Sequence, residues 1–150
     1  MRIPALVASV VLVFGLAGCG GAATTQETAS AQDGQAQGGQ VSADAAGQAF
    51  LHAFGTGDAR GVCAVMAAQG VPVESSPAIV DKCASALQGT LDTVKEHAGQ
   101  LSEATVTGAT VSGDTATFEN ATITPELGKS VLGSQSAVQI NGKWYIGAKF

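Results

Sequence analysis

The clearest structural signal in the chain is Ala137-Val138-Gln139-Ile140-Asn141-Gly142-Lys143-Trp144-Tyr145-Ile146. The central Asn-Gly pair is the preferred sequence for a two-residue type I′ turn, so this stretch predicts a β-hairpin. One face of the hairpin should carry Val138, Ile140 and Tyr145, and the other face Trp144, Ile146 and Phe150. Because both faces hold large apolar groups, one should pack on helices, and the other needs a cover or marks an interaction site.

Two segments rich in threonine and valine, 105–112 and 115–124, precede this hairpin. They predict two strands joined by a turn at Ser112-Gly113-Asp114. Within each segment the large apolar residues have opposite parity, as Phe118 and Ile123 do, so simple alternation cannot place both on one face. A bulge or kink in each strand, at Gly108 in the first, would restore the register and curve the sheet strongly.

Three helices are predicted before the strands. Ser42 is a suitable N-cap for the first helix, which should end near residue 54, and Asp58 for the second, over about 59–69. Ser76 followed by proline predicts the start of a third helix that ends near residue 98. The third helix carries an apolar stripe at helical spacing, formed by Val80, Cys83, Leu87, Leu91, Val94 and Ala98.

The N-terminal part of the chain is typical of an exported lipoprotein. Residues 1–18 begin with Met1-Arg2 and continue with an apolar run of roughly 20 Å as a helix, shorter than the ~30 Å hydrocarbon core. Such a run indicates a signal peptide. The motif Leu16-Ala17-Gly18-Cys19 resembles the bacterial lipobox at every position. An ordinary secretory signal with an incidental cysteine is the alternative.

The lipobox resemblance implies that Cys19 receives a diacylglyceryl group and becomes the first residue of the mature chain. Two acyl chains anchor a protein stably, so we expect attachment at the outer face of the cytoplasmic membrane. Residues 19–41 contain almost nothing large and apolar, which predicts a disordered linker. Residues 42–150 should then form one folded domain.

The number of cysteines limits which disulfides the chain can form. The chain has three cysteines, and lipid on Cys19 leaves Cys63 and Cys83. In an oxidising extracytoplasmic space these two most simply form a disulfide, which would join the second helix to the third. A reactive thiol or half of a metal site is the alternative, but there is no Cys-x-x-Cys motif and neither histidine has ligand spacing.

The charge of the chain restricts its partners. The net charge is −5, and only one basic residue is lost with the signal peptide. Phosphate binding needs a basic surface, so nucleic acid is not expected as a partner. The lipid on Cys19 would be the contact with the membrane, and a homodimer or another protein remains as partner. The sequence indicates no metal or cofactor.

A family resemblance rests on Ala49-Phe50-Leu51-His52-Ala53-Phe54-Gly55-Thr56-Gly57-Asp58-Ala59 and on the Asn141–Ile146 hairpin. Over about residues 44–150 the chain resembles the NTF2-like (cystatin-like, SnoaL-like) superfamily, and within it small actinobacterial lipoproteins. The resemblance implies an α+β fold, with three N-terminal helices packed on a curved four-stranded antiparallel sheet. This cone would enclose a pocket and often implies dimerisation through the outer sheet face. Candidates for the pocket or interface are Phe50, Phe54, Phe118, Trp144, Tyr145 and Ile146.

We assign no catalytic residue. Enzymes of the superfamily use a pocket Asp, His or Tyr, but His52 is expected to face solvent and His97 lies at a helix C-terminus. Asp58 is explained as a helix cap, which leaves Tyr145 or a pocket carboxylate as the candidate acid or base. We therefore expect a non-catalytic binding or interaction domain. The alternatives are an isomerase- or dehydratase-like enzyme and a passive spacer.

Overall fold

A computed structural model describes residues 38–148. The predicted signal peptide, the predicted lipidation site Cys19, nearly all of the predicted linker and Phe150 lie outside these residues. Within the described part, no helix combines the length and the apolar character that crossing a membrane requires.

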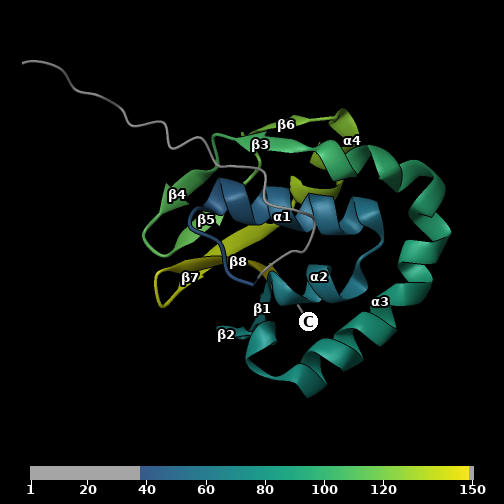
Figure 1. Cartoon of the computed structure of the whole chain (residues 1–150). Helices are drawn as coiled ribbons and strands as arrows, with labels where there is room; N and C mark the ends of the chain where they lie inside the picture. Colours follow the sequence, from purple (N-terminus) through teal and green to yellow (C-terminus); the bar gives the residue numbers. More distant parts are fainter. Residues whose placement is uncertain (1–37, 149–150) are drawn as a thin grey trace, which may run out of the picture. The chain divides into compact units, whose positions relative to one another are not determined.

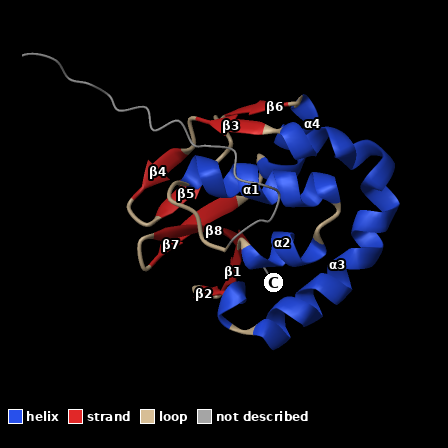
Figure 2. Cartoon of the chain, in the orientation of Figure 1, coloured by secondary structure: helices blue, strands red, loops and turns tan. Residues whose placement is uncertain are grey.

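The described residues form an α+β fold with α-helices, 3₁₀ helices and short strands (Figure 2). The α-helices are α1 (Ala43–Thr56), α2 (Ala59–Ala64), α3 (Pro77–Ala98) and α4 (Glu126–Leu132), and the 3₁₀ helices are η1 (Val73–Ser75) and η2 (Gly99–Glu103). The strands are β1 (Met66–Ala68), β2 (Val71–Pro72), β3 (Thr105–Thr107), β4 (Thr110–Ser112), β5 (Thr115–Thr117), β6 (Thr122–Thr124), β7 (Ser136–Ile140) and β8 (Lys143–Ala148).

The predicted architecture of three helices on a four-stranded antiparallel sheet is wrong. The main sheet has six strands in the order β2-β1-β8-β7-β5-β4, and β3 pairs with β6 in a separate two-stranded sheet. The main sheet is mixed, because β1 runs parallel to β8. Figure 1 shows α1 in front of β5 and β8, with β3, β6 and α4 to one side of it and α2 to the other.

The second predicted helix is much shorter than expected. It ends at Ala64, and the chain then enters β1 instead of continuing to about residue 69. Val65 and Ala67 are buried at strand spacing, and the Val65 carbonyl oxygen accepts a hydrogen bond of 2.8 Å from the Ile146 N–H. Pairing with β8 therefore outweighs the helix propensity of this segment, as tertiary context often does.

Each of the two predicted long strands is broken into two, and the halves join different sheets. At the first break Gly108 has a φ of +81°, and its N–H donates to the Asp44 carboxylate at 3.2 Å. The N–H of Ala109 donates to the same carboxylate at 2.8 Å. The kink predicted at Gly108 is thus a complete interruption, held by a side chain from the first turn of α1.

The break resolves the parity conflict in the sequence. Val106 pairs with Ile123 in the β3–β6 sheet, and both are buried in the main core. Phe118 follows β5 and is fully buried in the same core, whereas Val111 at the edge of the main sheet is 55% exposed. Two separate sheets allow Phe118 and Ile123 to face one core, which a single regular strand cannot do.

Helix α4 is not predicted from the sequence. It follows Pro125 and carries Glu126 in its first turn and Lys129 in its last, an order that suits the helix dipole. Its Leu132 is completely buried. Gly128 lets α4 lie close to the core, because a Cβ there would come within 2.7 Å of the Ile123 side chain.

Several local predictions are confirmed. Asn141 and Gly142 both have positive φ, at 52° and 79°, as a type I′ turn requires. The hairpin has the predicted register, with Val138 opposite Tyr145. The Ser42 side chain accepts a hydrogen bond from the Ala45 N–H at the start of α1. Helix α3 spans the predicted residues, and its stripe contacts the two apolar clusters of the domain.

The predicted disulfide between Cys63 and Cys83 is present, and it joins α2 to α3. Cys63 is fully buried, and it forms a small apolar cluster with Val73 and Val80 beside the main core. An ion pair between Arg60 and Asp81 joins the same two helices, but both side chains are more than half exposed. The covalent bond is therefore the strong link between these helices, because exposed ion pairs contribute little.

Removal of this disulfide should lower stability substantially. Closing a loop of this length stabilises a fold by about 3 kcal/mol in the chain-entropy model, or roughly 10 °C in melting temperature for a domain of this size. The double variant Cys63→Ala/Cys83→Ala should show this loss in urea and thermal unfolding. The control Asp81→Asn, which removes only the exposed ion pair, should lose less than about 1 kcal/mol. Equal losses in the two variants would show that the disulfide does not carry the α2–α3 link.

Candidate functional site

The space between α1 and the main sheet, where a pocket was predicted, is occupied by core side chains. Phe50, Phe118, Trp144 and Ile146 are between 0% and 8% exposed and belong to one apolar cluster. The half-buried Phe54 packs against this cluster and stacks on Phe50, with ring centroids 6.2 Å apart. The structure thus brings five of the six predicted pocket or interface residues together, as packing of the interior.

Tyr145, the sixth of these residues, lies on the opposite face of β8 from Trp144 and Ile146. It is only 3% exposed, and its hydroxyl donates a hydrogen bond of 2.6 Å to Glu74 Oε1. The same oxygen accepts a hydrogen bond of 3.2 Å from the Gly39 N–H. Glu74 lies in η1, so the hydrogen-bond partner of Tyr145 comes from a part of the chain 71 residues away.

Burial, reinforced by the neighbouring Glu74 carboxylate, raises the pKa of Tyr145 to about 12. The phenol therefore keeps its proton at neutral pH and already donates it to Glu74. A general acid or base works best when its pKa is near the operating pH. Tyr145 is thus poorly suited to the acid–base role for which it was the candidate.

The remaining titratable candidates have structural roles or are exposed. His52 is half-buried, and its Nδ1 donates to the Ser102 carbonyl oxygen at 2.6 Å, so the prediction that it faces solvent is wrong. This bond ties α1 to η2. Asp58 caps α2 as predicted, by accepting from the Gly61 N–H at 2.9 Å. His97 is exposed near the end of α3.

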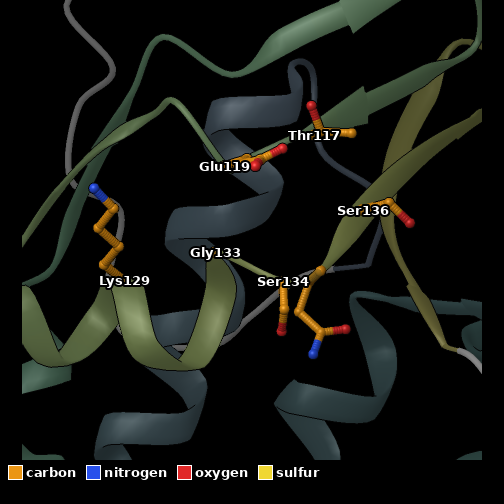
Figure 3. A pocket seen from close by; sticks show the side chains of 7 residues that line it. Thr117, Glu119, Lys129, Gly133, Ser134 and Ser136 are labelled. Carbon is orange, nitrogen blue, oxygen red and sulfur yellow. The ribbon is translucent and has the colours of Figure 1, made fainter.

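A surface hollow of about 500 Å³ lies where β5, α4 and β7 meet. It is open to solvent, and all of its lining residues except one glycine have polar side chains (Figure 3). The lining residues are Thr117, Glu119, Lys129, Gly133, Ser134, Gln135 and Ser136.

The alternation of side chains along a strand explains why Thr117 and Glu119 face outward. Thr117 and Glu119 flank Phe118, and since Phe118 points into the core its two neighbours are exposed. Thr117 pairs with Ser136 across the β5–β7 ladder, which joins the two walls of the hollow. In Figure 3 the Glu119 side chain appears between those of Thr117 and Lys129. The hollow is therefore fixed by the ends of regular elements.

Local sequence patterns do not predict this hollow. Its residues come from 117–119 and 129–136, and only the β5–β7 pairing and helix α4 bring the two segments together. The available signal was the Pro125-Glu126 start of α4, with Lys129 and Gly133 at its end. Unless that helix is predicted, the sequence gives no reason to expect residues 133–136 beside residue 117.

The hollow offers hydrogen-bonding groups of every kind. Three hydroxyls and the Gln135 amide can both donate and accept, the Glu119 carboxylate accepts, and the Lys129 ammonium group donates. Within residues 38–148, no three His, Cys, Asp or Glu side chains are grouped so that they could hold a metal ion. The arrangement suits recognition of a polar surface by hydrogen bonds.

Comparison with known proteins finds no family model, no curated protein and no solved structure that matches this chain.

The raised pKa of Tyr145 predicts a loss of stability at alkaline pH. In the unfolded chain a tyrosine titrates near pH 10, whereas Tyr145 in the folded protein has a pKa of about 12. Its contribution to folding should be complete below about pH 10 and should disappear as the pH rises towards 12. Urea unfolding of the wild type and Tyr145→Phe measures this contribution as the difference between them. That difference should shrink over this range, and a constant difference would contradict the assignment.

Proposed function

We propose that this protein is a lipid-anchored extracytoplasmic protein whose domain binds a partner without catalysing a reaction. The observation that carries the proposal is the division between interior and surface. Apolar side chains fill the space between α1 and the sheet, while hydrogen-bonding groups gather in the open hollow between β5, α4 and β7. The side chains that line the hollow can therefore bind a partner at the protein surface through hydrogen bonds.

The proposed location rests on two features of the chain. The first is the lipobox-like motif ending in Cys19, which lies outside the described residues. The second is the Cys63–Cys83 disulfide, which is typical of proteins that fold in an oxidising extracytoplasmic space. With both remaining cysteines paired, Cys19 is the thiol left for a lipid.

The composition of the hollow favours a polar partner surface, such as the exposed backbone and side chains of another protein. Its lining contains Glu119 and Lys129, so it can contact groups of either charge. The acidic net charge of −5 disfavours a polyanion such as nucleic acid. Interfaces between proteins that associate reversibly contain many direct hydrogen bonds, for which these side chains supply donors and acceptors.

The enzyme alternative has no specific support. It requires an acid or base in a pocket under the sheet, where Trp144, Ile146 and Phe118 are packed. Tyr145 lies on the other face of β8 with a pKa of about 12. We therefore propose no second function.

The anchor can be tested with Cys19→Ala. This variant should move from the membrane fraction to the soluble fraction, because it lacks the thiol that receives the lipid. Mass spectrometry of the wild type should show a mature chain that begins at residue 19 and carries a diacylglyceryl group. Cys63→Ala/Cys83→Ala serves as the control and should stay with the membrane. An unmodified mass for the wild type would refute lipid anchoring.

The binding surface can be tested by photo-crosslinking in cells. A photoreactive residue at Gln135 should yield a discrete crosslinked product, whereas one at the exposed Thr90 on α3 should not. Ser134→Trp, which places a large side chain in the hollow, should reduce the yield at least about tenfold, the effect of a ~1.4 kcal/mol loss in binding. Thr93→Trp on α3 is the matched control. Equal yields from Gln135 and Thr90 would refute the hollow as the binding surface.

A further inference from the structure

The residues just before α1 are attached to the sheet. The N–H of Gln40 donates to the Trp144 carbonyl oxygen at 2.9 Å, and the N–H of Trp144 donates to the Gln40 carbonyl oxygen at 2.7 Å. This antiparallel bridge lies on the edge of β8 that β1 occupies further along, from Ile146 to Ala148. Figure 1 shows the first described residues passing beside β8 before the chain turns into α1.

Two glycines allow this close approach. A Cβ at Gly39 would overlap the ring and hydroxyl of Tyr145 and would lie 2.7 Å from the Cβ of Lys143. The Lys143 Cβ is attached directly to the backbone of β8, so it cannot move aside as a flexible side-chain end could. A Cβ at Gly38 would overlap the Glu74 carboxylate. The Gln40 side chain closes the segment by donating from Nε2 to the Gly38 carbonyl oxygen at 2.6 Å.

The same segment covers the hydrogen bond between Tyr145 and Glu74. The Gly39 N–H and the Tyr145 hydroxyl both donate to Glu74 Oε1, at 3.2 Å and 2.6 Å. Tyr145 is left only 3% exposed, although it is on the face of β8 that turns away from α1. Three parts of the chain, residues 38–40, η1 and β8, therefore meet at one carboxylate oxygen.

We propose that Gly38–Gln40 form a strap that fastens the N-terminal segment of the chain to β8. A pull on that segment then acts on β8, a strand in the interior of the six-stranded sheet, and not on the first turn of α1. The strap also covers backbone groups of β8 that could otherwise pair with another chain.

Hydrogen exchange in the wild-type chain tests the strap first. If the bridge exists, the amides of Gln40 and Trp144 should both be protected. If either amide exchanges at the rate of an unstructured chain, the strap is overturned. This measurement needs no variant and is unaffected by any folding defect.

A pair of glycine substitutions gives the second test. Gly39→Ala introduces the Cβ that Tyr145 and Lys143 exclude, and Gly99→Ala is the matched control, because nothing lies within 4 Å of its Cβ. Gly39→Ala should make the Gln40 and Trp144 amides exchange at least about tenfold faster, as expected for a locally opened segment. Gly99→Ala should leave both rates unchanged. Equal rates in the two variants would overturn the proposal.

The titration of Tyr145 provides an independent readout in the same variants. Since the chain contains one tyrosine, its alkaline ultraviolet absorbance reports Tyr145 alone. Lifting the strap exposes the ring, so the midpoint should fall from about 12 towards the ordinary value near 10 in Gly39→Ala and stay in place in Gly99→Ala. An unchanged midpoint in Gly39→Ala would show that the segment does not cover the tyrosine.

Discussion

Side chains on a β-strand point alternately to its two faces, and this constraint in β8 organises the domain. Trp144 and Ile146 belong to the core cluster shared with α1, so Tyr145 between them must face the other way. That second face is closed by Glu74 from η1 and by Gly38–Gly39. A slip of one residue would exchange the two sets, placing the Tyr145 hydroxyl in the apolar core and the indole ring against the Glu74 carboxylate, so burial on both faces fixes the register strongly.

The break at Gly108 has a comparable effect on the other half of the domain. Since the Asp44 carboxylate accepts from two backbone N–H groups there, the chain leaves the small sheet and enters the main one within two residues. After β5 the chain continues through Phe118, whose burial turns Thr117 and Glu119 outward. It then forms β6 and α4 before it rejoins the main sheet as β7. The polar hollow is thus a consequence of how the chain moves between two sheets.

Local sequence patterns predicted local structure well. The Asn141-Gly142 turn, the Ser42 and Asp58 caps and the apolar stripe of α3 are each determined by residues close in sequence. The failures are non-local. Val65–Ala68 is too short to distinguish strand from helix, and only the distant β8 decides between them. Glu74 and Tyr145 are 71 residues apart, and the hollow needs α4, so neither site could be assembled from local patterns.

The register of β8 is the central claim, and nuclear Overhauser contacts from Trp144, Tyr145 and Ile146 test it most directly. The chain has one tryptophan and one tyrosine, so both aromatic spin systems are unambiguous. The account predicts contacts from Ile146 and the Trp144 indole to core residues of α1, and from the Tyr145 ring to Gly39 and Glu74. Contacts from Tyr145 to α1, with the indole on the outer face, would contradict the register and the filled interior that depends on it.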